Sequence, residues 1–137
     1  MKSLINDSNS IKTFDYIFID CPPALSLLTV MAMTAANSVL VPLQCEFFAL
    51  EGLSQLIKTV DRVHKNLNPL LSIDGIILTM FDKRNKLSTQ VAMDVKKHLQ
   101  EKVFETMIPR NVRVSEAPSF GMPVIIYDRK SKGSQAY

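Results

Sequence analysis

The sequence contains few of the cysteines and glycines that characterise disulfide-rich, collagen-like and linker-like chains. Its 137 residues include two cysteines, four glycines and no tryptophan. Two cysteines cannot form the several cross-links of a disulfide scaffold, and four glycines exclude a collagen-like or linker-like chain. Because nothing upstream of Cys21 resembles a secretory signal, we expect Cys21 and Cys45 to be reduced thiols of a cytoplasmic protein. With 47% hydrophobic and 21% charged residues, the chain has the composition of one globular domain.

A long uncharged stretch raises the question of a membrane span. No charged residue lies between Asp20 and Glu46, a distance sufficient to cross a bilayer. However, Pro22, Pro23 and Pro42 interrupt both ends of the stretch, polar residues are spread through it, and the flanking charges are acidic. We therefore expect a loop, a buried helix and a buried strand here, with no membrane insertion.

The charged residues are distributed unevenly along the chain. Residues 1–82 carry five Lys/Arg and eight Asp/Glu, whereas residues 83–137 carry eleven Lys/Arg and five Asp/Glu. A basic C-terminal half indicates an anionic partner such as nucleic acid, a nucleotide or a membrane surface. A solvated helix face followed by a basic tail would give the same count, so charge alone leaves both interpretations open.

Hydrophobic patterning predicts alternating strands and helices. We expect strands at 15–20, 38–43, 73–81 and 105–108, helices at 25–36, 50–67 and 87–99, and a short helix or turn at 112–119. Such alternation favours right-handed crossovers between parallel strands. The predicted fold class is therefore α/β, a mostly parallel sheet with helices on both faces in three α/β/α layers.

Chemistry in such a fold is expected beyond the carboxyl ends of the strands. Four segments fall there: 20–23, 44–46, 81–86 and 109–115. Asp20 ends a hydrophobic run, where a carboxylate can hold Mg²⁺, directly or through water, beside nucleotide phosphates. A simple turn cap is the alternative role for an aspartate in this position.

Several long motifs in sequence carry a family resemblance. They are Phe-Asp-Tyr-Ile-Phe-Ile-Asp-Cys-Pro-Pro at 14–23, Gln-Cys-Glu-Phe-Phe-Ala-Leu-Glu-Gly-Leu at 44–53, and Ile-Pro-Arg-Asn-Val-Arg-Val-Ser-Glu-Ala-Pro-Ser-Phe-Gly at 108–121. Pro-Val-Ile-Ile-Tyr-Asp follows at 123–128. In this order and spacing, the chain from about residue 14 to 137 resembles the ParA/Soj chromosome-partitioning ATPases, which are relatives of MinD.

The resemblance implies a deviant-Walker P-loop NTPase fold that binds ATP with Mg²⁺ between two subunits. Members of the family form ATP-dependent homodimers that bind DNA without sequence preference, and a ParB-type centromere-binding partner stimulates hydrolysis. By position, Asp20 would be the Walker B carboxylate that holds Mg²⁺ via water. Arg84 and Arg113 align with arginines that contact the DNA backbone. Six further residues would lie around the adenine: Thr79, Met80, Asp82, Pro109, Arg110 and Asn111.

The local charge supports part of this DNA assignment. Residues 83–113 contain eight Lys/Arg and three Asp/Glu, a local net charge of +5. Non-specific DNA binding needs cations spread over a face and no base readout. For Lys96 and Lys97 we prefer an ordinary solvated helix surface, whereas for Arg84 and Arg113, both near strand ends, we favour DNA.

The phosphate-binding loop of such ATPases is missing from these residues. None of the four glycines belongs to a Gly-x-x-x-x-Gly-Lys-Ser/Thr pattern, and only 19 residues precede Asp20. We therefore expect residues 1–137 to be a single, truncated ParA-type P-loop NTPase domain, its C-terminal part, unable to hydrolyse ATP alone. Without the central P-loop strand, hydrophobic strand edges would stay unpaired, so we expect marginal stability or self-association.

Two other functions remain open. A catalytically inactive DNA- or partner-binding module of the same fold would keep the basic face. A MinD-like membrane-associated regulator would need a C-terminal amphipathic helix, but residues 128–137 offer charge with almost no apolar stripe. We expect a cytoplasmic, nucleoid-associated protein with no membrane partner.

Overall fold

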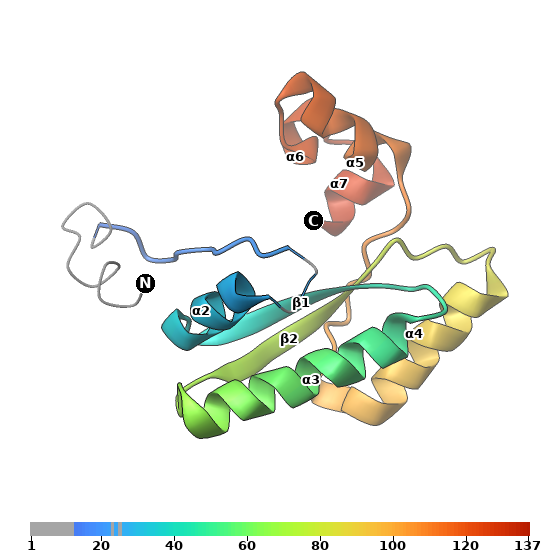
Figure 1. Cartoon of the computed structure of the whole chain (residues 1–137). Coiled ribbons are helices and arrows are strands. Elements are labelled where there is room, and N and C mark those ends of the chain that lie inside the picture. Colours follow the sequence, from blue (N-terminus) through green and yellow to red (C-terminus); the bar gives the residue numbers. More distant parts are fainter. Residues whose placement is uncertain (1–12, 23, 25) are drawn as a thin grey trace. The chain divides into compact units, whose positions relative to one another are not determined.

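The larger helices and strands follow the predicted alternation (Figure 1). The structure is a computed structural model that describes residues 13–22, 24 and 26–137. Its main elements are α2 (Leu27–Ala35), β1 (Ser38–Gln44), α3 (Ala49–Asn66), β2 (Ser72–Thr79) and α4 (Lys86–Leu99). Short helices complete the chain: η1 (Gln100–Lys102), α5 (Val112–Glu116), η2 (Ala117–Phe120), α6 (Val124–Tyr127) and α7 (Lys132–Ala136).

The two strands pair in parallel. At one end Ser72 donates its backbone N–H to the Asn37 carbonyl at 3.3 Å, and at the other Cys45 donates to the Thr79 carbonyl at 3.1 Å. The partner residue number rises along both strands, which is the pattern of parallel pairing. The predicted α/β class with a parallel sheet is therefore confirmed, with two strands in the described part of the chain.

The described residues divide into two compact units. The first contains the residues up to Val39 together with Ser54–Asp74, and the second contains Leu40–Leu53 and Gly75–Tyr137. Strands β1 and β2 and helix α3 each contribute residues to both units.

The core of the first unit forms where α2 and α3 present their apolar faces. It consists of the buried side chains of Met33, Val60, Val63 and Leu71. Residues three or four positions apart share one face of a helix, which explains why Val60 and Val63 are buried together. Buried Asn68 lies beside this core and donates its side-chain amide to the Met33 and Ala36 carbonyls, at 3.1 and 2.8 Å.

In the second unit, β2 and α4 supply the most deeply buried side chains. Ile76, Leu78 and Val95 have no exposed surface. Helix α4 begins at Lys86 because Asn85 caps it, its Oδ1 accepting the Leu87 N–H at 3.0 Å. These contacts fix the β2–α4 connection, which carries several of the predicted site residues.

The strand predicted at 105–108 is wrong. A bend lies at Glu105, and two isolated parallel bridges flank the segment, Ile76 with Val103 and Phe81 with Pro109. The backbone N–H of Ile108 nevertheless donates to the Leu78 carbonyl at 2.8 Å. The segment therefore keeps the predicted parallel direction without forming a regular strand.

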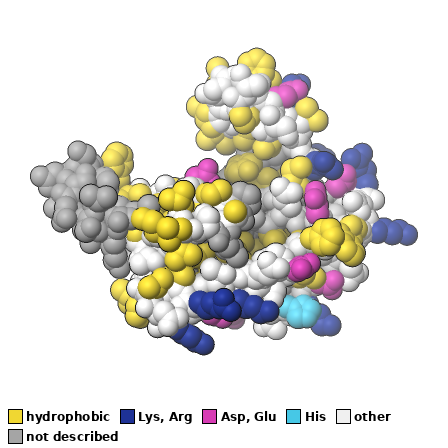
Figure 2. Space-filling view, viewed as in Figure 1, with side chains coloured by type: hydrophobic (Ala, Val, Ile, Leu, Met, Phe, Trp, Pro, Cys, Tyr) yellow, Lys and Arg dark blue, Asp and Glu magenta, His cyan; other side chains and the backbone are white. Residues whose placement is uncertain are grey.

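The buried strand predicted at 15–20 is also wrong. These residues have no regular secondary structure, and all are exposed, Tyr16 by 80% and Phe18 by 82%. A strand is stabilised by hydrogen bonds to a neighbouring strand and by burial, and no strand in the described part of the chain pairs with this segment. Large hydrophobic side chains consequently lie uncovered on the surface, as Figure 2 shows for one face.

Candidate functional site

The end of β2 and the segment around Pro109 lie against each other in the second unit. Phe81 donates its N–H to the Ile108 carbonyl at 3.1 Å, and its own carbonyl accepts the Arg110 N–H at 3.0 Å. The family resemblance placed Thr79, Met80 and Asp82 in one candidate site with Pro109, Arg110 and Asn111. The structure brings these two short segments together through the backbone of Phe81.

Met80 gives the end of β2 an uncommon backbone conformation. Its φ is +54°, in the left-handed region that a residue other than glycine seldom adopts. Such a conformation costs about 1 kcal/mol or more and persists only where neighbouring contacts enforce it. Here the Thr79 carbonyl is bound by Cys45 on one side, and the Phe81 N–H is bound by Ile108 on the other. The turn that directs the following loop is thereby fixed.

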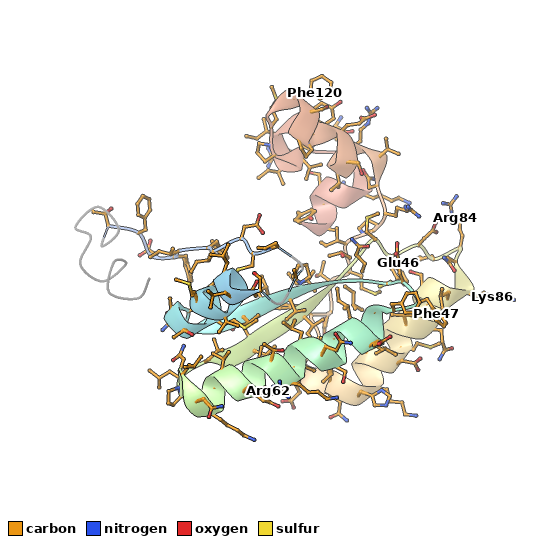
Figure 3. All side chains as sticks on the ribbon, viewed as in Figure 1. Glu46, Phe47, Arg62, Arg84, Lys86 and Phe120 are labelled. Carbon is orange, nitrogen blue, oxygen red and sulfur yellow. The ribbon has the colours of Figure 1, made fainter. Side chains whose placement is uncertain are left out.

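Asp82 and Arg84 form a bidentate ion pair in that loop. The Arg84 Nε donates to Asp82 Oδ1 at 3.1 Å, and Nη2 donates to Oδ2 at 2.9 Å. The Arg84 backbone N–H also donates to Oδ1, at 3.0 Å. These bonds to Arg84, with a smaller contribution from the charge of Arg110, lower the pKa of Asp82 to about 2. The Arg84 side chain extends from the loop between β2 and α4 (Figure 3) and is 90% exposed.

A buried serine anchors the same loop. Ser88, on the buried face of α4, accepts the Asp82 backbone N–H at 3.2 Å. The thiol of Cys45 is also buried, which raises its pKa, although a hydrogen bond with Ser88 partly offsets this. Sequence reasoning missed Ser88, whose only signal is its position four residues before Ala92 on the apolar face of a predicted helix.

Arg113 is held in a different way from Arg84. Its Nη1 donates to Glu116 Oε2 at 2.9 Å, and its Nε lies 3.4 Å from Asp128 Oδ2. Glu116 also accepts the Tyr127 hydroxyl at 3.3 Å, so Arg113 belongs to a network that joins α5 to the end of α6. The predicted site residue Asn111 caps α5, its Oδ1 accepting the Arg113 N–H at 2.9 Å.

The predicted magnesium ligand, Asp20, lies in a different compact unit from Asp82 and Pro109. It belongs to the first unit, is exposed and lies in the segment that lacks a strand. Within residues 13–22, 24 and 26–137, no three His, Cys, Asp or Glu side chains cluster as a metal site. A lone exposed carboxylate suits Mg²⁺ only where water and substrate phosphates supply the remaining ligands.

Comparison with known proteins identifies close relatives in sequence. A family described as an AAA domain matches residues 2–73. The chain is 64% identical over 124 residues to a chromosome partitioning protein ParA of Caulobacter vibrioides, and 56% identical over 126 residues to the sporulation initiation inhibitor protein Soj of Bacillus subtilis. These alignments cover 90% and 92% of the chain but only 46% and 50% of the relatives. The chain thus spans about half the length of the curated relatives it matches.

Solved structures of nucleotide-binding proteins share the fold. Cobyrinic acid a,c-diamide synthase from Mycobacterium smegmatis, with bound ADP and magnesium, matches 99% of the chain with a TM-score of 0.76 and 35% identity. The cell division ATPase MinD of Pyrococcus furiosus matches 98% with a TM-score of 0.74 and 25% identity. The chain covers 48% and 52% of these two proteins.

No helix of the described residues is both long and apolar enough to cross a membrane.

Proposed function

The chain belongs to the AAA-domain family, and from its 64% and 56% identity to a ParA and a Soj protein we propose that it acts within a ParA/Soj-type partitioning ATPase. In this proposal residues 1–137 are the C-terminal part of a single P-loop NTPase domain. The ATPase binds ATP with Mg²⁺, forms a homodimer and binds DNA without sequence preference. A ParB-type protein is its partner, and it works in the cytoplasm on the nucleoid.

The observation that carries this proposal is the junction of two segments at the end of β2. Backbone hydrogen bonds of Phe81 connect the segment of Thr79, Met80 and Asp82 to the Pro109–Asn111 segment. Both segments lie at the carboxyl end of the parallel strand β2, the end at which ligands bind in α/β folds. We assign the adenine of ATP to this junction.

The remaining assignments concern the phosphates and the DNA. Asp20 holds Mg²⁺ through water, and a phosphate-binding loop must come from residues that this sequence does not contain. Because that loop neutralises most of the charge on the transferred phosphate, the 137 residues do not hydrolyse ATP by themselves. Arg84 and Arg113, both exposed, contact the DNA backbone.

Two binding measurements on the full chain test the proposal. Equilibrium dialysis with radiolabelled ATP and Mg²⁺ should detect binding, and Asp82→Ala should weaken it. Fluorescence anisotropy with duplexes of unrelated sequence should give similar affinities, and these should fall as salt rises. Arg113→Ala should reduce the slope of log K against log salt by about one. Arg62→Ala, which removes the same charge from α3, should leave the slope unchanged.

The outcomes separate the proposal from its main alternative. Binding of both ATP and DNA supports the ATPase assignment. Binding of DNA without ATP supports a catalytically inactive DNA-binding module, which the absence of a phosphate-binding loop from these residues favours. Failure to bind either ligand would refute the assignment of both sites to this chain.

A further inference from the structure

The pairing of Asp82 with Arg84 bears on how this chain would engage DNA. We propose that Asp82 is a positioning residue that masks the Nε–Nη2 edge of Arg84, so that a DNA phosphate must displace the Asp82 carboxylate before it binds Arg84 through that edge. The inference rests on the proposed DNA-binding function. It concerns a carboxylate that the family resemblance assigned only to the surroundings of the nucleotide.

The geometry of the pair shows why the two anions compete. Both oxygens of Asp82 accept from one edge of the Arg84 guanidinium, through Nε and Nη2. Arginine binds a phosphate group through the same bidentate geometry. One edge of the guanidinium cannot satisfy a carboxylate and a phosphate together, so phosphate binding at Nε and Nη2 requires exchange.

The two partners differ in how freely they can move. Arg84 has a 90% exposed side chain, whereas that of Asp82 is 25% exposed. The backbone of Asp82 is held on both sides, its N–H by Ser88 Oγ at 3.2 Å and its carbonyl by the Asn85 N–H at 3.0 Å. Exchange therefore moves the arginine outward and leaves the aspartate in place.

The carboxylate left behind stays charged after the exchange. The Arg84 backbone N–H still donates to its Oδ1, and the nearby Arg110 still favours the ionised form. Asp82 then remains as a negative charge close to the incoming phosphate, which it repels. Masking thus weakens DNA binding in two ways, by occupying Arg84 and by opposing the phosphate.

The Asp82→Asn variant tests the masking. Asparagine keeps an oxygen that can accept the Arg84 backbone N–H, so the turn is retained while the charge is lost. In duplex DNA anisotropy titrations we expect about threefold tighter binding, comparable to the strength of an exposed ion pair. We also expect a salt slope steeper by about 0.9, the value of one phosphate contact.

Two further variants show whether the effect passes through Arg84. Arg84→Ala should weaken DNA binding slightly in the parent chain and more strongly in the Asp82→Asn background. Asp94→Asn removes the same charge from α4, where the carboxylate accepts from Gln90 and not from an arginine. It should therefore change the affinity and slope less than Asp82→Asn does.

A measurement that does not involve DNA separates the masking of Arg84 from the proposed DNA-binding function. In NMR spectra of the parent chain, the Arg84 Nε–H should exchange slowly with water, and in Asp82→Asn it should exchange quickly. Rapid exchange in the parent chain overturns the masking, as does an Asp82→Asn effect equal to that of Asp94→Asn or unchanged by Arg84→Ala. Slow exchange without DNA binding by any variant refutes the DNA-binding function, and with it the role of the masking.

Discussion

Replacing Asn68 with alanine is expected to destabilise the protein by about 2–3 kcal/mol. The Asn68 side chain is only 3% exposed, and its amide nitrogen binds the carbonyls of Met33 and Ala36 at the end of α2. Carbonyls in the last turn of a helix have no partner further along the helix. Without Asn68 these two carbonyls lose a hydrogen-bond donor in a largely buried region. They lie at the end of α2, the helix that follows the segment of Asp20.

The magnitude follows from the two hydrogen bonds. Each contributes about 1 kcal/mol net, and leaving a buried acceptor unpaired costs about 1–3 kcal/mol. Native domains have a total unfolding free energy of about 5–15 kcal/mol, and with unpaired strand edges we expect this chain to lie near the lower end of that range. With a urea dependence of about 2 kcal/mol per molar, the midpoint of unfolding should fall by about 1–1.5 M.

Urea unfolding followed by circular dichroism at low protein concentration measures this change. Asn66→Ala is the matched control because Asn66 is exposed and its amide binds only the Arg62 carbonyl within α3. It should shift the unfolding free energy by less than about 0.5 kcal/mol. If Asn68→Ala shifts the midpoint no more than Asn66→Ala, the hydrogen bonds to α2 do not stabilise the fold as reasoned.

Two other predictions concern exposed and buried groups. Because the apolar segment around Phe18 is exposed, the chain should self-associate as its concentration rises. The Phe18→Lys variant should reduce this association in sedimentation velocity experiments. Sedimentation of the parent chain as a monomer at every concentration would contradict the prediction. Cys21 is exposed and Cys45 is buried with a raised pKa, so Cys45 is protonated and unreactive up to a higher pH. Iodoacetamide at pH 8 should label Cys21 first, and mass spectrometry showing equal rates at both thiols would count against the buried position of Cys45.

The helices were predictable because their own side chains determine where they form. Leu53, Leu56, Val60 and Val63 recur at helical spacing, and α3 lies where this pattern places it. Strands depend on partners elsewhere in the chain. The run at 15–20 has the composition of a buried strand, yet no described strand pairs with it, and its side chains are exposed.

The candidate site was predictable as a set of segments but not as a set of contacts. The rule that ligands bind beyond strand ends led to both Asp82 and Pro109, and the structure joins their segments through Phe81. The ion pair of Asp82 with Arg84 depends on a turn that begins with the left-handed backbone of Met80, and methionine gives no sequence signal for that conformation. The metal role of Asp20 stays a prediction.

The two compact units are interleaved along the sequence, since the chain passes from the first to the second at Leu40, returns at Ser54 and leaves again at Gly75. No single cleavage of the backbone can release either unit whole, and a gene encoding one continuous stretch cannot produce one of them intact. A protease that cuts between β1 and α3 would sever both units at once. Deletion analysis of this protein will therefore report on both together, and point substitutions are the means of addressing each alone.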